Sequence, residues 1–449
     1  MIKKRTLYTV LLLVLSLSIQ SQSKFNFYGT KNKKVSIKFK LVNNLIVIPI
    51  EVNGSPLSFI LDTGVDKTIL FNVAHNDSID LNNVKKIRLQ GLGKGKPIEA
   101  LLSSRNTMKM KNFVSNSEAI YVILRDEFDV SGKMGVTIHG IIGHKIFKDA
   151  IVSINYSTKK LTLYNPNGYV AKKCRGCQKF PLQFYRNKPY IDAKVQLDTI
   201  GDTYTDVKML IDTGGSESLW LFENTKEEIK TPIRHFKDIL GEGLSGTIYG
   251  NRSRIKGVKI GRFQIKNPTV SFLDSLSTFH ARKFKERNGS IGGNILKRFK
   301  IWIDYPNKKM HLKKNGSFKG GFEYNMSGLD VGYNGKVLVK EKDTNTHIDS
   351  YARTDSETNN NFTINYSINY RYQFKPSFIV THVLSDSPAG KAGIKKDDII
   401  ISINKRYVYE LTLHELLNKF RRGHRKKIIM KVERNGMPMK FQFQLMKKI

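Results

Sequence analysis

An Asp-Thr-Gly tripeptide occurs twice in the chain, and carboxylates placed in this way can do acid–base chemistry. Asp62 opens the first copy and Asp212 opens the second (212 − 62 = 150). Each copy follows one apolar run and precedes another, which predicts a strand, a tight turn and a second strand. Two carboxylates held close together cannot both ionise easily, so one keeps its proton. Such a pair can take a proton from water and give one to a carbonyl oxygen, as hydrolysis of an amide requires.

The tripeptides belong to a longer internal repeat. A Gly-x-Gly segment recurs at the same offset (241 − 91 = 150), and an Ile-Gly pair recurs with one residue of slippage (292 − 143 = 149). Features that return in the same order at nearly constant spacing indicate an internal duplication. Two similar lobes can face each other about an approximate two-fold axis, so Asp62 and Asp212 are expected to share one site.

This pattern resembles the aspartic proteases, in which each lobe carries apolar-apolar-Asp-Thr-Gly, a glycine-bearing flap and a later apolar-apolar-Gly. The resemblance covers roughly residues 36 to 315. It implies that Asp62 and Asp212 are the catalytic pair, that each Thr supports the pair by hydrogen bonds to the opposite lobe, and that each glycine lets the backbone turn sharply. The implied supporting residues are Thr63, Gly64, Thr213 and Gly214, and the implied flap residues are Gly91, Leu92, Gly93, Gly241, Glu242 and Gly243.

The sequence departs from the family pattern after the tripeptides. The family usually has Ser or Ala there, whereas this chain has Val65 and Gly215. The Ser hydroxyl tunes the pair in that family, so the change concerns the pH optimum more than the activity. A catalytically inactive scaffold, in which the lobes bind extended peptides without cutting them, is the alternative. Retention of both Asp62 and Asp212 argues against it.

The N-terminus predicts export. A basic start (Lys3-Lys4-Arg5) precedes an apolar run from Leu7 to Ile19, and small polar residues follow as far as Ser23. The run is shorter than the ~18 apolar residues that a membrane span needs. Residues 1–23 therefore predict a secretory signal peptide, with an uncleaved anchor as the alternative. The mature protein is expected in a bacterial periplasm or outside the cell.

The charge is strongly positive, with 76 basic against 38 acidic residues and a net charge of +38. The basic residues are spread through the chain and no nucleic-acid motif accompanies them, so no nucleic-acid partner is expected. Attraction to an anionic membrane surface or to acidic polypeptides is one use of this charge, and simple solubility is the other.

The repeat predicts the domain organisation. The first lobe is assigned to residues 24–170, the linker to 171–180 and the second lobe to 181–318. The linker holds both cysteines, Cys174 and Cys177, and a disulfide is the default prediction in an exported chain. A redox-active pair is the alternative. Neither a metal site nor a cofactor is expected, and a chain that completes its own carboxylate pair is expected to be a monomer.

The C-terminal part, residues 322–449 with a polar insertion at about 340–370, has other signals. Ser387 is placed to cap a short helix, and Thr412 with Glu415 forms a capping box for a second helix. The Ser-Pro-Ala series that begins at Ser387 resembles a PDZ domain. The resemblance implies that a peptide C-terminus adds as a strand beside the second helix, its carboxylate held by a glycine-bearing loop. The implied peptide-binding residues are Gly328, Leu329 and His414.

The sequence thus predicts a mainly β chain, with two pseudo-symmetric aspartic-protease β-barrel lobes followed by a PDZ domain, a β-sandwich with two helices. The predicted activity is that of an exported aspartic endopeptidase that hydrolyses polypeptide substrates. Its PDZ domain is expected to recognise a substrate or partner by its C-terminus.

Overall fold

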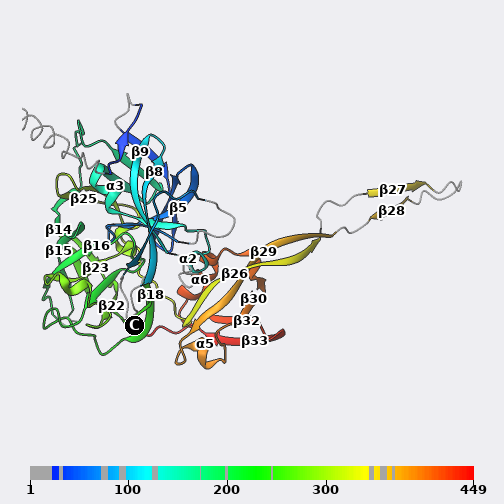
Figure 1. Cartoon of the computed structure of the whole chain (residues 1–449). Helices are drawn as coiled ribbons and strands as arrows, with labels where there is room; N and C mark the ends of the chain where they lie inside the picture. The colour runs from blue at the N-terminus through cyan, green and yellow to red at the C-terminus, as the bar shows by residue number, and fades with distance from the viewer. Residues whose placement is uncertain are drawn as a thin grey trace, which may run out of the picture. The chain divides into compact units, whose positions relative to one another are not determined.

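The computed structural model describes residues 23–29, 34–71, 79–89, 98–123, 130–171, 173–197, 201–243, 246–342, 348–353, 362–366 and 370–449. The predicted signal peptide up to residue 22 and the predicted flap residues Gly91, Leu92 and Gly93 lie outside these ranges. The chain forms two compact units, shown in Figure 1. The first comprises Met1–Asp129, Ile138–Phe322 and Ile449, and the second comprises Val130–Thr137 and Glu323–Lys448.

The first lobe is a barrel. Strand β5 (Ser55–Leu61) lies between β4 (Leu45–Val52) and β10 (Gly140–Ile142), and the pairing of β8 (Ile98–Met110) with β9 (Phe113–Ile123) closes the sheet on itself. Closure leaves few unpaired edges, as the alternating apolar runs of the sequence require. The other elements of this lobe are β1 (Asn26–Phe27), β2 (Lys34–Lys38), β3 (Lys40–Val42), β6 (Thr68–Leu70), β7 (Lys85–Leu89), α3 (His144–Asp149), β11 (Ile151–Asn155) and β12 (Lys160–Tyr164).

The second lobe repeats the strand order of the first around its central parallel pair, although its described strands form an open sheet and not a closed one. Strand β16 (Thr205–Ile211) pairs in parallel with β23 (Arg287–Ile291), as β5 does with β10 in the first lobe. The described strands run in the order β18-β19-β22-β17-β23-β16-β15-β20-β21, with β14 beside β15. The other elements are β13 (Cys177–Pro181), β14 (Gln183–Tyr185), β15 (Lys188–Gln196), β17 (Leu219–Phe222), β18 (Phe236–Gly243), β19 (Gly246–Arg254), β20 (Gly257–Ile260), β21 (Phe263–Lys266), β22 (Thr269–Leu273), η1 (Ala281–Lys283), α4 (Gly293–Leu296), β24 (Phe299–Asp304) and β25 (Lys309–Lys314).

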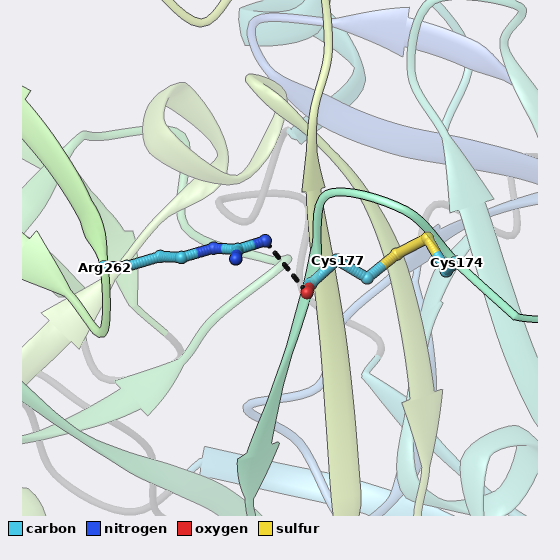
Figure 2. Close-up of a disulfide and its surroundings, with 3 residues drawn as sticks. All are labelled: Cys174, Cys177 and Arg262. Carbon is cyan, nitrogen blue, oxygen red and sulfur yellow. Dashed lines mark hydrogen bonds between the residues drawn. A yellow bond between two sulfur atoms is a disulfide. The ribbon is translucent and has the colours of Figure 1, made fainter.

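A six-stranded sheet joins the two lobes. Its order is β13-β25-β24-β11-β12-β2, so the closing hairpins of both lobes meet at the antiparallel pair β11–β24. Apolar side chains from both lobes and from this sheet form one buried cluster. Within the predicted linker at 171–180, the residues from Cys177 onward form β13 and pair with β25. The two cysteines are joined by a disulfide, and Arg262 donates to the carbonyl oxygen of Cys177 at 3.0 Å (Figure 2).

The second unit is built on a sheet in the order β26-β29-β30-β32-β33, with β31 beside β30. Both predicted caps are present: the Ser387 hydroxyl accepts from the Gly390 N–H, and Thr412 and Glu415 form the capping box. The elements of this unit are α2 (Val130–Met134), β26 (Leu329–Lys342), β27 (Ile348–Arg353), β28 (Phe362–Tyr366), β29 (Tyr370–Val383), α5 (Pro388–Lys391), β30 (Ile399–Ile403), β31 (Arg406–Tyr407), η2 (Val408–Glu410), α6 (Leu413–Arg421), β32 (Lys427–Arg434) and β33 (Met437–Gln444).

Two sequence-based assignments change here. Residues Val130–Thr137, which the repeat placed in the first lobe, belong to the second unit by their contacts. The predicted polar insertion at about 340–370 contains strands. Strand β26 runs on to Lys342, β29 begins at Tyr370, and β27 pairs with β28 between them (Figure 1). Among the helices of the described residues, none has the length and apolar character of a membrane-spanning segment.

Candidate active site

The two Asp-Thr-Gly loops occupy equivalent places in the two lobes. Asp62 follows β5 directly, and its N–H donates to the carbonyl oxygen of Ile142 at 2.8 Å. Asp212 follows β16, and its N–H donates to that of Ile291 at 3.0 Å. In each lobe the supporting strand is the parallel neighbour, so the carboxylate stands at the end of two paired strands. The apolar-Gly motifs of the sequence supply these supporting strands.

The threonines lock the loops together across the lobes. The Thr63 N–H donates to the Thr213 hydroxyl and the Thr213 N–H donates to the Thr63 hydroxyl, both at 3.0 Å. Each hydroxyl donates in turn to a carbonyl oxygen of the opposite lobe, Thr63 to Ile211 at 2.5 Å and Thr213 to Leu61 at 2.8 Å. Both threonines are fully buried. These are the contacts that the resemblance implied for them, and they fix one loop relative to the other.

The glycines bring the carboxylates together. The Gly64 N–H donates to Asp62 Oδ1 at 2.6 Å, and the Gly214 N–H donates to Asp212 Oδ1 at 3.1 Å. A Cβ atom at Gly64 would lie 3.0 Å from Asp62 Oδ1 and 3.4 Å from Asp212 Oδ1, so both carboxylates converge on the same backbone. A Cβ atom at Gly214 would overlap the Asp62 carboxylate. Any larger residue at these positions would push the two acids out of place.

The two acids have different electrostatic surroundings. Part of each side chain remains accessible to solvent, yet the surrounding protein removes most of the water and raises the pKa of both. The charge of Asp212 adds to this effect and raises the pKa of Asp62 to about 7. Arg287 and, less strongly, Lys188 oppose burial at Asp212 and favour its ionised form. Arg287 therefore favours the negative charge on Asp212, and with it the shared proton on Asp62.

Lys188 and Arg287 were missed by the sequence analysis. Lys188 is the first residue of β15, and burial lowers the pKa of its ammonium group. Arg287 is the first residue of β23 and is only 4% exposed, with its guanidinium donating to the Ser290 hydroxyl at 2.7 Å. Arg287 could have been noticed in the sequence, because it is the one charged residue of the strand Arg287–Ile291. Lys188 had no such signal.

The apolar-Gly motifs support the loops through close backbone contacts. A Cβ atom at Gly143 would overlap the carbonyl oxygen of Asp62, and one at Gly292 would overlap that of Glu217. The carbonyl oxygens of Val65 and Gly215, the two positions that depart from the family pattern, accept from the next residues of these motifs at 3.1 and 2.6 Å. The backbone of Val65 and Gly215 therefore supports the loops, although their side chains depart from the family pattern.

Hairpins occur where flaps were predicted in both lobes. In the second lobe, Gly241, Glu242 and Gly243 end β18, and Gly243 pairs with Gly246 at the turn into β19. In the first lobe, β7 and β8 pair as a hairpin on either side of residues 90–97, which are not described.

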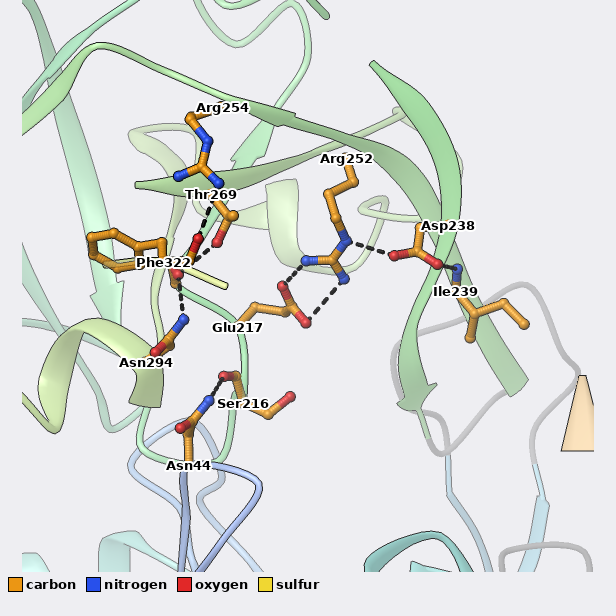
Figure 3. A network of polar contacts seen from close by, with 11 residues as sticks. Asn44, Ser216, Glu217, Asp238, Ile239, Arg252, Arg254, Thr269, Asn294 and Phe322 are labelled. Carbon is orange, nitrogen blue, oxygen red and sulfur yellow. Dashed lines mark hydrogen bonds and ion pairs between the residues drawn. The ribbon is translucent and has the colours of Figure 1, made fainter. Parts of the chain in front are cut away.

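A partly buried ion-pair network connects the second hairpin to the second loop, as Figure 3 shows. Arg252 on β19 donates to both carboxylate oxygens of Glu217, at 2.5 and 3.1 Å, and to Asp238 on β18 at 2.5 Å. Burial raises the pKa of Asp238, and Arg252 opposes this effect. Glu217 lies five positions beyond Asp212 in the second Asp-Thr-Gly loop, so the network joins that loop to the hairpin.

The predicted peptide-binding residues lie in the second unit. Gly328 has a φ of +80° and precedes β26, and its carbonyl oxygen accepts from the Leu384 N–H at 2.9 Å. Leu329 is buried at the start of β26, and His414 is an exposed residue in the first turn of α6. Within the described residues, no group of His, Cys, Asp or Glu side chains is arranged to hold a metal ion.

Comparison with known proteins finds family models that match each of two regions of the chain. Residues 48–146 and 195–295, which contain the two loops, match the family model described as aspartyl protease, and residues 379–434 match that of the PDZ domain. Among solved structures, an aspartic proteinase from Irpex lacteus is 13% identical; the alignment covers 64% of this chain and 99% of that chain, with a TM-score of 0.43. No curated protein matches the sequence.

Proposed function

Since the chain is an aspartic-type peptidase that also carries a PDZ domain, we propose that it is an exported endopeptidase whose catalytic residues are Asp62 and Asp212. The observation that carries this proposal is the locked geometry of the two loops. Reciprocal hydrogen bonds between Thr63 and Thr213 hold them, and both carboxylates converge on Gly64. A loop pair kept only for peptide binding would not need two acids in one desolvated place.

The proposed reaction uses one charged and one protonated acid. Ionised Asp212 takes a proton from a water molecule, whose oxygen attacks the peptide carbonyl carbon, while Asp62 gives its proton to the carbonyl oxygen. In the second step the C–N bond breaks, and the amine takes the proton held by Asp212. Asp62 regains a proton from one hydroxyl of the intermediate as the carboxyl product forms. Both acids are then back in their starting states.

The test is cleavage of a mixed peptide library between about pH 3 and 8, with products identified by mass spectrometry. Asp62→Asn and Asp212→Asn are each expected to abolish cleavage, because an amide can neither take nor give the required proton. Asp206→Asn is the matched control, since Asp206 lies on β16 with a side chain that is 70% exposed. Cleavage that survives either catalytic substitution would contradict the mechanism. Saturable peptide binding without turnover by the unaltered protein would favour the inactive scaffold.

The proposal of export rests on the first 23 residues. It is supported by the disulfide between Cys174 and Cys177, which suits an oxidising compartment. Phe25 is only 1% exposed and its N–H donates to Asp149 at 2.9 Å, so a mature chain that starts just before it keeps this contact. N-terminal sequencing of the protein recovered from the periplasm or medium is expected to begin near residue 24. Retention of the protein in the cytoplasm with an intact Met1 would exclude export.

We further propose that the partners are polypeptides and an anionic membrane surface, with no nucleic acid, and that the enzyme acts as a monomer. The membrane contact is assigned to the ribbon formed by β26 and β29. Leu338 pairs with Phe374 and Lys340 pairs with Tyr372, so these side chains share one face. Leu338, Phe374 and Tyr372 are between 54% and 69% exposed. Exposed aromatic rings interleaved with lysines are typical of protein surfaces that lie in a membrane interface.

The ribbon face predicts vesicle binding that depends on its aromatic rings. The double substitution Tyr372→Ser with Phe374→Ser is expected to weaken sedimentation with phosphatidylglycerol-containing vesicles by about tenfold or more, since each ring would bury apolar area in the interface. Val337→Ser, on the opposite face of the same ribbon, is the control. Equal sedimentation of the unaltered protein, the double variant and Val337→Ser would exclude the ribbon face as the membrane contact. Binding to vesicles of phosphatidylcholine alone would show that charge is not required.

A further inference from the structure

A segment of the first lobe's sequence lies in the PDZ unit. Residues Val130–Thr137 stand between β9 and β10 along the chain, yet their contacts place them with Glu323–Lys448. Within the segment, α2 packs against β26, and Gly132 and Met134 are buried. An exposed surface loop would have no reason to bury these two residues.

The segment touches both walls of one groove. Strand β26 is at the edge of the described sheet, where it pairs with β29 alone, and α6 also packs against it. Gly135 has a φ of +65°, and a Cβ atom there would lie 2.7 Å from the Cβ of Leu413, the first residue of α6. A Cβ atom at Gly332 on β26 would lie 3.8 Å from the carbonyl oxygen of Gly132. The segment therefore lies between the edge strand and the helix, where PDZ domains take an added peptide strand.

We propose that Val130–Thr137 is an internal ligand of the PDZ groove, and that a polypeptide C-terminus binds there by displacing it. The segment is suited to exchange because α2 is short and helical. An extended peptide can form ladder hydrogen bonds along β26 that a helix does not form. Since the segment is tethered at both ends, its effective concentration is high and only a matching ligand can compete with it.

Displacement of Val130–Thr137 would affect the Asp62 loop through the residues that follow the segment in the chain. Ile138, the next residue, is buried in the first unit, and the N–H of His139 donates to the carbonyl oxygen of Ser58 on β5 at 2.8 Å. Strand β10 follows at once and ends at Ile142, whose carbonyl oxygen accepts from the Asp62 N–H. Movement of the segment therefore acts on the strand that holds Asp62. This consequence rests on the proposed peptidase activity, whereas the internal ligand does not.

The binding test uses the full mature chain and a fluorescein-labelled peptide with the sequence of residues 130–137. Gly135→Val is expected to release the segment, because its side chain meets Leu413 and a β-branched residue disfavours positive φ. The anisotropy titration should then give a dissociation constant at least about tenfold lower than that of the unaltered protein, since more of the grooves are open. Met134→Asp, which places a charge at a buried position, should give the same result. Thr137→Ala, at an exposed position of the same segment, should bind like the unaltered protein.

A second substitution identifies the groove. Gly332→Val on β26, added to Gly135→Val, should abolish the gain in affinity. Amide hydrogen exchange should rise at the start of β26 in Gly135→Val while β30 and β32 stay protected, which shows that the unit remains folded. The proposal is overturned if Gly135→Val and Met134→Asp bind the peptide no more tightly than the unaltered protein. It is also overturned if Gly332→Val leaves the gain intact.

The coupling between peptide binding at the groove and catalysis is tested separately, by enzyme kinetics. A saturating amount of the same peptide is expected to change kcat/KM of the unaltered protein at least about fivefold, and Gly332→Val should remove the change. A constant kcat/KM would exclude the coupling through β10. If the chain cleaves no peptide at all, the proposed function fails while the binding titration still decides whether the segment is an internal ligand.

Discussion

At the scale of single residues, the two acids of the pair differ in how strongly nearby cations favour their ionised forms. Arg287 acts on Asp212, and Lys188 favours the ionised form of both acids. Burial acts in the opposite direction on both. The pH profile of the enzyme should therefore rise as Asp212 ionises and fall near pH 7 as Asp62 loses its proton.

Lys188→Met is expected to move both limbs of this profile to higher pH by about one unit. Removing the cation raises the pKa of Asp212, which must be ionised, so the acidic limb moves up. It also raises the pKa of Asp62, which must be protonated, so the basic limb moves up as well. The measurement is kcat/KM against pH, with Lys194→Met as control because Lys194 is an exposed lysine on the same strand, β15. An unchanged profile, or a shift to lower pH, would show that Lys188 does not act on the pair.

At the scale of elements, the second hairpin and the second loop share one buried arginine. Arg252 pairs with Glu217 in the loop and with Asp238 in the hairpin, and all three side chains are at most 21% exposed. Removing one partner from such a network leaves the others charged and unpaired in a poorly solvated place. Arg252 thus ties the hairpin to the loop, in addition to the pairing of β19 with β22.

Arg252→Met is expected to lower the free energy of unfolding by about 3–5 kcal/mol. Urea denaturation followed by circular dichroism measures this change. Lys237→Met serves as the control, since Lys237 is exposed on the neighbouring strand β18 and its loss should cost about 0.5 kcal/mol or less. A loss for Arg252→Met no larger than that of the control would mean that the network contributes no net stability.

At the scale of the whole molecule, we expect the two lobes to unfold together because they share a sheet. Ile154 of β11 pairs with Ile301 of β24, and both residues are fully buried in the cluster that spans the lobes. Neither closing hairpin can separate without exposing this cluster. Both tryptophans, Trp220 and Trp302, lie in the second lobe and report on its unfolding.

Ile154→Ala in the first lobe is therefore expected to destabilise the second lobe as well. The cavity should cost about 2–5 kcal/mol, and the urea midpoint seen by tryptophan fluorescence should fall together with the midpoint seen by circular dichroism. Lys160→Ala, an exposed position on the adjacent strand β12, should leave both midpoints in place. A fluorescence midpoint that stays constant for Ile154→Ala would show that the lobes unfold independently.

Features that depend on neighbours along the chain were readable from the sequence. The Asp-Thr-Gly turns, the apolar-Gly motifs at matching spacing and the caps at Ser387 and Thr412 each require particular residue types within a few positions. Their physical causes are backbone geometry, hydrogen-bond capping and side-chain periodicity, which are local. The repeat itself predicted that the two acids share a site, since two equivalent lobes must present equivalent turns.

Features that depend on residues far apart in the sequence needed the tertiary structure. Lys188 and Arg287 act on Asp212 only because β15, β16 and β23 lie in one sheet. The end of the linker became β13 because β25 offered an unpaired edge, which no local pattern reveals. Val130–Thr137 joined the second unit for the same reason: its apolar and glycine positions are too few to specify a partner, and only the groove beside β26 gives them one.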